Sequence, residues 1–148
     1  MKVAILMGSP RDDEKMAGAS EMLTRFGVEH EVHVMSAHRT PEEVAEFASN
    51  ARSNGFGVII CGAGMAAHLA GVVSAHTTIP VIGVPLSGGI SGGMDALLST
   101  VQMPRGIPVA TVAVDGSANA GVLAVEILSQ SNAELVAQHQ RFMDEGAM

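Results

Sequence analysis

The sequence predicts an α/β fold in which a five-stranded parallel sheet lies between two layers of helices. Three observations lead to this prediction. Short apolar runs of strand length alternate five times with segments whose apolar residues recur at helical spacing. Turns rich in glycine separate many of these segments. The first run, Lys2–Met7, is apolar almost throughout, which is typical of a strand buried on both faces of a parallel sheet. Such alternation predicts parallel strands joined by right-handed crossovers.

The first strand is followed by a turn at residues 8–13 and then by a helix. Gly27 suits the position just after that helix, where a left-handed backbone is common. Residues 28–35 alternate between apolar and polar side chains and predict the second strand, with Val32 and Val34 on one face. The buried face of the first helix is predicted to consist of Met16, Ala19, Leu23 and Phe26.

A second helix is predicted at residues 42–52. Thr40 is expected to be its N-cap, Pro41 suits the first helical position, and Glu43 would complete a capping box. Its apolar residues recur at the spacing i, i+3, i+4, i+7, which is typical of an amphipathic helix. These residues are Val44, Phe47, Ala48 and Ala51.

The remaining strands are predicted at 57–63, 80–86 and 109–114, and the remaining helices at 65–76, 94–101, 118–130 and 132–146. Five strands in 148 residues favour one domain, 1–148, with the flavodoxin-like strand order 2-1-3-4-5 and an extra C-terminal helix. Asn132 can cap that last helix. One side of it is expected to carry Leu135, Val136, His139, Phe142 and Met143.

Composition limits the classes of function. A net charge of −7 and a pI near 5.2 argue against binding nucleic acid or an anionic membrane through a basic face. No apolar run approaches the roughly 20 residues of a membrane span, and the start of the chain does not resemble a signal peptide. The single cysteine, Cys61, provides no disulfide framework, so we expect a cytoplasmic protein.

The loops that follow the first four strands contain most of the candidate binding residues. They lie at 8–13, 36–41, 62–68 and 87–93, and Arg11 and Arg39 fall within them, while Arg105 lies in a later loop. Glycine-rich turns before helices offer free N–H groups to anions, so a phosphorylated small molecule is the expected ligand. The alternative is that the glycines only form tight turns and that the charged side chains are solvated.

His38 and Arg39 place a titratable ring beside a fixed cation at the end of the second strand, where open α/β sheets bind ligands. His68 follows the glycine-rich end of the third strand, which the predicted order places beside the first. His76 is expected at the far end of the following helix, away from the site. We therefore expect one pocket to contain Ser9, Asp12, His38, Arg39 and His68.

Several motif matches do not support the functions with which these motifs are usually associated. Residues 62–67 fit G-x-G-x-x-A, but no acidic residue lies about 20 positions on, which disfavours a dinucleotide site. Residues 89–93 fit G-x-S-x-G, yet a hydrolase triad would need His139 to face the same site. His30 and His33 lie on opposite faces of a strand and cannot share a metal. Without Trp or Tyr a flavin site is disfavoured, and we predict no metal or cofactor.

Taken together, five segments resemble the N5-carboxyaminoimidazole ribonucleotide mutase family of purine biosynthesis. The segments are 7–12, 36–41, 62–69, 83–85 and 102–108, and the similarity spans nearly the whole chain in one order. The resemblance implies a small ribonucleotide as substrate and a homo-octamer. It also implies that Ser9, Asp12 and Arg39 hold the ribose phosphate and its hydroxyls, that His38 is the catalytic acid and base, and that His68 lies beside the reacting carboxylate.

Arg11 stands where family members often carry a second serine, and we count it with Ser36 and Gly64 among the substrate-binding residues. The family's reaction moves a carboxylate from an exocyclic nitrogen to ring carbon C4, giving 4-carboxy-5-aminoimidazole ribonucleotide on the route to IMP. One histidine can both give and take the proton that this transfer requires. Two alternatives stay open, namely a related carboxylase that captures free carbon dioxide and a non-catalytic sensor of a phosphorylated metabolite.

The resemblance also distinguishes the two enzymatic branches. In the carboxylase branch a lysine typically follows the histidine that corresponds to His38, whereas this chain has Arg39. The carboxylase branch also has a different, serine-containing segment in place of residues 66–69, which read Ala-Ala-His-Leu here. Both positions favour the mutase.

Overall fold

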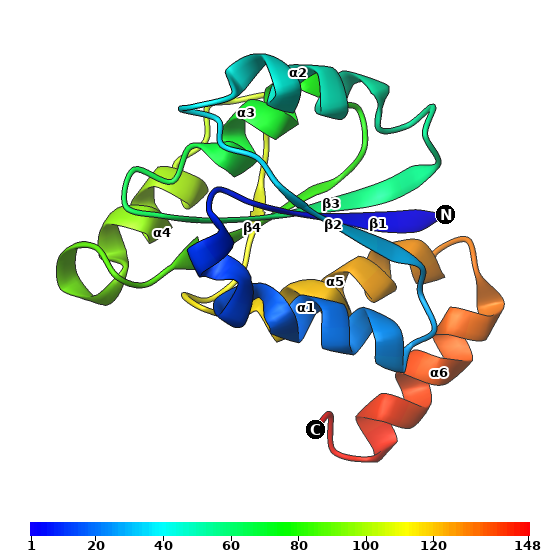
Figure 1. Ribbon diagram of the computed structural model, residues 1–148. Coiled ribbons are helices and arrows are strands. Elements are labelled where there is room, and N and C mark those ends of the chain that lie inside the picture. The colour runs from blue at the N-terminus through cyan, green and yellow to red at the C-terminus, as the bar shows by residue number, and fades with distance from the viewer.

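A parallel sheet forms the middle layer of the computed structural model, which describes residues 1–148 (Figure 1). Its strands are β1 (Lys2–Met7), β2 (His30–Val34), β3 (Phe56–Gly64), β4 (Val81–Leu86) and β5 (Ala110–Thr111). All neighbouring strands are parallel, and their order is β2-β1-β3-β4-β5. The predicted order is therefore confirmed, and the carboxyl ends of the strands meet along one edge of the sheet.

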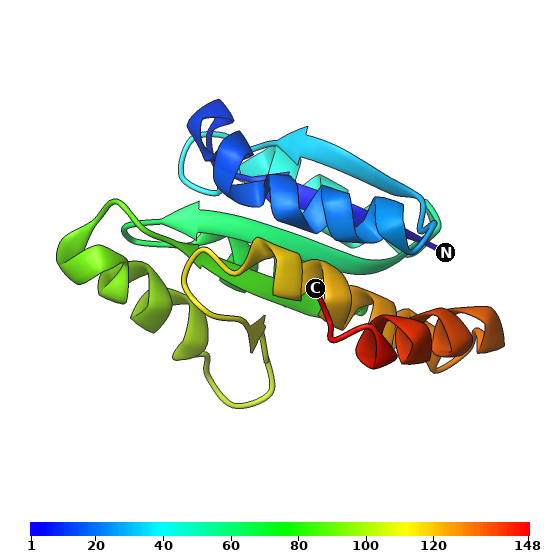
Figure 2. The same cartoon turned by 90° about the horizontal axis from the view of Figure 1, so that it is seen from below.

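Helices cover both faces of the sheet, as Figures 1 and 2 show. One face is covered by α1 (Asp13–Arg25) and α5 (Ser117–Ser129), with α6 (Ala133–Asp144) packed against α5 at the outside. The other face is covered by α2 (Pro41–Asn50), α3 (Leu69–His76) and α4 (Met94–Val101). Two short 3-10 helices, η1 (Pro10–Asp12) and η2 (Ile90–Gly92), lie in the loops after β1 and β4. No helix is both long and apolar enough to cross a membrane.

Successive side chains of β1 point to opposite faces of the sheet and enter two separate cores. Val3, Ile5 and Met7 pack with α1 and α5, whereas Ala4 and Leu6 pack with α2 and α3. All five are at most 1% exposed. Burial on both faces explains why this strand is apolar throughout. The predicted apolar face of α1 is likewise buried.

Two of the predicted elements differ from the structure by more than two residues at one end. The fifth strand was predicted at 109–114, but β5 contains two residues, because it lies at the sheet edge and pairs only with Ile82 and Gly83 of β4. The third helix was predicted from residue 65, but α3 begins at Leu69. Met65 has a φ of 53°, which belongs to the left-handed region and cannot start a right-handed helix.

The predicted capping box before α2 is wrong. The Thr40 side chain makes no capping hydrogen bond to the helix. Instead its Oγ1 accepts a hydrogen bond from Ser36 N–H over 3.2 Å and donates to the Ser36 carbonyl over 3.3 Å. These contacts close the loop that precedes the helix, so Thr40 stabilises the loop rather than the helix end. Pro41 does occupy the first turn of α2, as predicted.

The apolar side predicted for the last helix divides into a buried part and an exposed part. Leu135 and Phe142 are 7% and 6% exposed and extend the core beneath α1. Val136 and Met143 are 53% and 54% exposed. Asn132 caps the helix as predicted, and its side chain accepts hydrogen bonds from Glu134 N–H and Leu135 N–H.

Candidate active site

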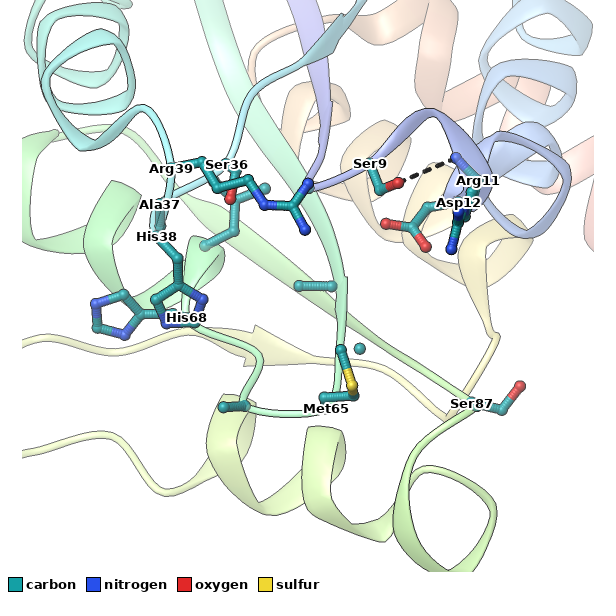
Figure 3. Close-up of a pocket in the computed structure, with 16 residues that line it drawn as sticks. Ser9, Arg11, Asp12, Ser36, Ala37, His38, Arg39, Met65, His68 and Ser87 are labelled. Atoms are coloured by element: carbon teal, nitrogen blue, oxygen red, sulfur yellow. Dashed lines mark hydrogen bonds between the residues drawn. The ribbon is translucent and has the colours of Figure 1, made fainter.

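A cavity of about 310 Å³ lies at the carboxyl edge of the sheet, where the loops after β1, β2, β3 and β4 converge (Figure 3). This is the place where open α/β sheets commonly bind ligands. The structure brings all of the predicted site residues to its wall: Ser9, Arg11, Asp12, Ser36, His38, Arg39, Gly64 and His68. These residues come from three separate segments of the chain, and Ser87 and Gly88 add a fourth.

The loop after β1 is shaped by Ser9. Its side chain caps η1 by accepting a hydrogen bond from Arg11 N–H over 3.3 Å, and its carbonyl accepts from Asp12 N–H over 3.0 Å. Pro10 occupies the first turn of η1, where its missing N–H costs nothing. The turn presents the side chains of Arg11 and Asp12 at the same side of the cavity (Figure 3).

Partial burial raises the pKa of the Asp12 carboxyl above its ordinary value of 3.8. The positive charge of Lys15 and a backbone hydrogen bond at Ser9 act in the opposite direction but do not overcome the burial. The folded protein therefore disfavours the ionised carboxyl relative to the unfolded chain. The penalty is fully present above the raised pKa and disappears as pH falls below the unfolded value.

We therefore expect Asp12→Asn to raise the melting temperature at pH 7, because the variant removes a partly desolvated charge. The Asp12 side chain makes no capping hydrogen bond to α1, so the substitution breaks no such bond. The gain should shrink as pH falls toward about 4, where the wild-type carboxyl becomes protonated. Thermal denaturation of both proteins at the two pH values measures the difference. A variant less stable than wild type at pH 7 would contradict this account.

The loop after β2 is a compact turn built on Ser36. The Ser36 carbonyl accepts hydrogen bonds from Arg39 N–H over 3.2 Å and from Thr40 N–H over 2.8 Å, and Ala37 is buried beneath the turn. These contacts fix the backbone on which the exposed side chains of His38 and Arg39 stand. In Figure 3 the Arg39 guanidinium reaches across the cavity toward Ser9.

Two histidines from different loops stack against each other in the cavity. The ring centroids of His38 and His68 lie 4.9 Å apart, and the ring planes differ by only 3° (Figure 3). His68 reaches this position because residues 65–68 are not helical and carry the chain away from β3 before α3 begins. Histidine is the side chain most often used as a general acid or base, so the pair is suited to acid–base chemistry.

The end of β3 supplies small residues to the cavity wall. Gly64 pairs with Leu86 of β4, and a Cβ atom at Gly64 would lie 3.4 Å from the Leu86 carbonyl oxygen. Ala63 and Ala66 also line the wall. Small side chains at these positions leave room for a ligand to approach the backbone closely.

Sequence reasoning assigned no role to two residues of the wall, Met65 and Ser87. Met65 combines its positive φ with a side chain that is 66% exposed. Ser87 is the first residue after β4, and Lys15 of α1 donates hydrogen bonds to it. Loop 87–93 was expected at this edge of the sheet, and Ser87 could have been identified there as the first residue after the strand.

Other candidate residues lie outside the cavity. Arg105 does not line it, and His76 is exposed at the end of α3. His139 packs against Phe26 and Phe142 under α1, so it does not join a hydrolase triad with Ser91. His30 contacts Ser20, whereas His33 contacts Glu31. No three side chains of the His, Cys, Asp or Glu types are grouped closely enough to hold a metal ion.

Comparison with known proteins identifies close relatives. The family model described as AIR carboxylase matches residues 2–147. The chain is 51% identical to an N5-carboxyaminoimidazole ribonucleotide mutase from Aliivibrio fischeri, over 98% of this chain and 91% of the relative. It is also 51% identical to a phosphoribosylaminoimidazole carboxylase from Schizosaccharomyces pombe, over 96% of this chain but only 26% of that protein.

A solved structure shares the fold. The crystal structure of Treponema denticola PurE superimposes with a TM-score of 0.89 at 29% sequence identity, and the match covers 98% of this chain and 90% of that one.

Proposed function

Because this chain belongs to the AIR carboxylase family, we propose that its cavity moves the carboxylate of N5-carboxyaminoimidazole ribonucleotide to ring carbon C4. The product is 4-carboxy-5-aminoimidazole ribonucleotide, an intermediate of purine biosynthesis, and the enzyme is an isomerase. The observation that supports this most strongly is geometric. The eight residues that the sequence assigned to the site, seven from the motifs of the mutase family together with Arg11, all line one cavity.

The proposed reaction needs one proton to be given and one to be taken. The bond between the exocyclic nitrogen and its carboxylate breaks, carbon dioxide forms, and the nitrogen gains a proton. Ring carbon C4 then bonds to that carbon dioxide and loses its own proton. We assign both proton transfers to His38, which can act first as acid and then as base. The ring of His68 is stacked on that of His38 with the centroids 4.9 Å apart, and we assign it a place beside the transferred group.

The remaining residues are proposed to bind the substrate. Arg39 supplies a fixed positive charge for the phosphate, and Ser9 and Asp12 offer hydrogen-bonding groups to the phosphate and the ribose hydroxyls. Arg11, Ser36 and Gly64 complete the binding wall. The backbone of Gly64 allows the transferred carboxylate to approach closely, since no side chain intervenes. No cofactor is assigned to the reaction, because the carboxylate that moves is already on the substrate.

A carboxylase that captures free carbon dioxide is the second candidate. It is favoured by the relatives named phosphoribosylaminoimidazole carboxylase, but this chain spans only about a quarter of their length. Two features of the chain favour the mutase instead. Arg39 follows His38 where the carboxylase branch typically has lysine, and residues 66–69 match the mutase branch.

We expect rapid conversion of N5-carboxyaminoimidazole ribonucleotide at low bicarbonate, and use of aminoimidazole ribonucleotide only at high, unphysiological bicarbonate. The purified protein should be given each nucleotide separately while absorbance of the carboxylated product is followed. If aminoimidazole ribonucleotide with modest carbon dioxide were the better substrate, the mutase assignment would be wrong, although the cavity would remain the active site.

The protein is also proposed to be a cytoplasmic homo-oligomer. The expected size is an octamer, as the resemblance to the mutase family implies. Exposed apolar side chains on α4 and α6 support association. They are Met94, Leu98, Val101, Val136 and Met143, each between 47% and 54% exposed. Burying them between copies would gain hydrophobic stabilisation. Light scattering at micromolar concentration measures the mass, and a monomer would contradict the proposal.

A further inference from the structure

The N–H, the carbonyl and the hydroxyl of Ser87 all form hydrogen bonds with other segments of the chain. Its N–H donates to Asp115 Oδ1 over 2.9 Å. Its carbonyl oxygen and its hydroxyl oxygen accept hydrogen bonds from Lys15 Nζ over 2.7 Å and 2.8 Å. Lys15 belongs to α1 and Asp115 to the turn between β5 and α5, so three distant segments of the chain meet at this serine.

The two side chains that hold Ser87 are oppositely charged. Lys15 Nζ lies 4.0 Å from Asp115 Oδ1, and both side chains are partly exposed. Burial by itself would raise the pKa of the Asp115 carboxyl. The hydrogen bonds from the Ser87 side chain and backbone, together with the charge of Lys15, outweigh burial and hold this pKa below its ordinary value. Asp115 therefore remains an ionised acceptor at neutral pH.

The segment held in this way forms part of the active-site wall. Ser87 and Gly88 both line the cavity, and Gly88 has a φ of 116°, a conformation open mainly to glycine. The N–H groups of Gly88 and Gly89 donate to no protein acceptor. The chain is thus fixed at Ser87 and offers free donors at the next two residues.

The position of this wall indicates which part of the substrate it meets. In Figure 3 Ser87 lies on the side of the cavity occupied by Arg11 and Asp12, away from the stacked rings of His38 and His68. The histidines are assigned to the transferred carboxylate. The opposite side, with the free N–H group of Gly88 and nearby cations, is suited to an anionic group such as a sugar phosphate.

We propose that Lys15 is a positioning residue, which together with Asp115 fixes Ser87 and Gly88 as the wall against which the phosphorylated ribose of the substrate binds. The identity of the ligand rests on the proposed function. The role of Lys15 in fixing the wall does not, because Lys15 contacts Ser87 of this chain rather than the ligand.

The test compares Lys15→Met with Lys2→Met, which is a matched control. These are the only two lysines of the chain, and Lys2 pairs with Glu31 at the opposite edge of the sheet. Each variant loses one positive charge. Lys15→Met should raise KM about tenfold with kcat changed less than twofold, because a charge-assisted contact that shapes binding is lost. Lys15→Arg should recover most of this loss, and Lys2→Met should match wild type.

Two further measurements use no nucleotide substrate. Ribose 5-phosphate should bind about tenfold more weakly to Lys15→Met than to Lys2→Met. Amide exchange at Ser87 should accelerate in Lys15→Met and in Asp115→Asn, because both variants weaken the contacts that hold this residue.

Equal KM values and equal Ser87 exchange in the two lysine variants would overturn the inference. A fall in kcat at unchanged KM would also overturn it. A wrong assignment of function would give a different result, because the wild-type protein itself would then not convert N5-carboxyaminoimidazole ribonucleotide.

Discussion

His38→Asn is expected to reduce turnover by about 10²–10⁴-fold while leaving folding and substrate binding nearly unchanged. The asparagine side chain keeps a similar size and polarity but cannot carry a proton between the exocyclic nitrogen and ring carbon C4. His38 stands exposed on a turn whose hydrogen bonds are made by Ser36, so the substitution removes no contact of the core. Steady-state turnover under chemistry-limited conditions measures the loss.

His76→Asn is the matched control for this variant. It makes the same chemical change at an exposed histidine at the far end of α3, outside the cavity. The control should retain wild-type turnover. If His38→Asn kept more than about a third of wild-type turnover, His38 could not be the acid–base residue. The same variant distinguishes an enzyme from a sensor, because a sensor would retain its affinity and have no turnover to lose.

Arg39→Ala should weaken substrate binding by about 10–100-fold, which corresponds to roughly 1.5–3 kcal/mol for a charge-assisted hydrogen bond. The physical reason is that the Arg39 guanidinium reaches across the cavity toward Ser9, where the phosphate is proposed to lie (Figure 3). Calorimetry with the substrate or with the product measures the affinity directly.

Arg141→Ala is the control for this second prediction. Arg141 is an exposed arginine on α6, remote from the cavity, and its loss changes net charge by the same amount. Affinity of the control should equal that of wild type. Unchanged affinity in Arg39→Ala would place the phosphate elsewhere in the molecule.

The sheet could be predicted from the sequence because its signal is local. Each of the first four strands is bounded by turn residues, and burial on both faces makes β1 and β3 apolar. The short β5 could not be predicted, because its length depends on where the chain diverges from β4, which itself continues to Leu86. The start of α3 was missed because the left-handed backbone at Met65 occurs at a residue that rarely adopts it.

The site was predictable where its residues lie in the short loops that follow strands, as Ser9, His38 and His68 do. Three features could not be read from sequence spacing, and the first two of them depend on tertiary contact. They are the stacking of His38 on His68, the reach of Lys15 to Ser87, and the preference of Thr40 for Ser36 over the helix end. For the first two the partner lies in another loop, whereas the Thr40 hydroxyl could accept a hydrogen bond from either of two local N–H donors, Ser36 or the first turn of the helix.

The measurement that tests the central claim most directly follows the fate of the carboxylate itself. N5-carboxyaminoimidazole ribonucleotide labelled with ¹³C in its carboxylate should be converted in buffer that contains excess unlabelled bicarbonate. Samples without enzyme and with His38→Asn correct for spontaneous loss of the label. We predict that most of the 4-carboxy-5-aminoimidazole ribonucleotide formed keeps the label, because the cavity returns the same carboxylate to the ring. Product whose carboxylate is diluted to the isotopic composition of the bicarbonate would contradict the proposed transfer.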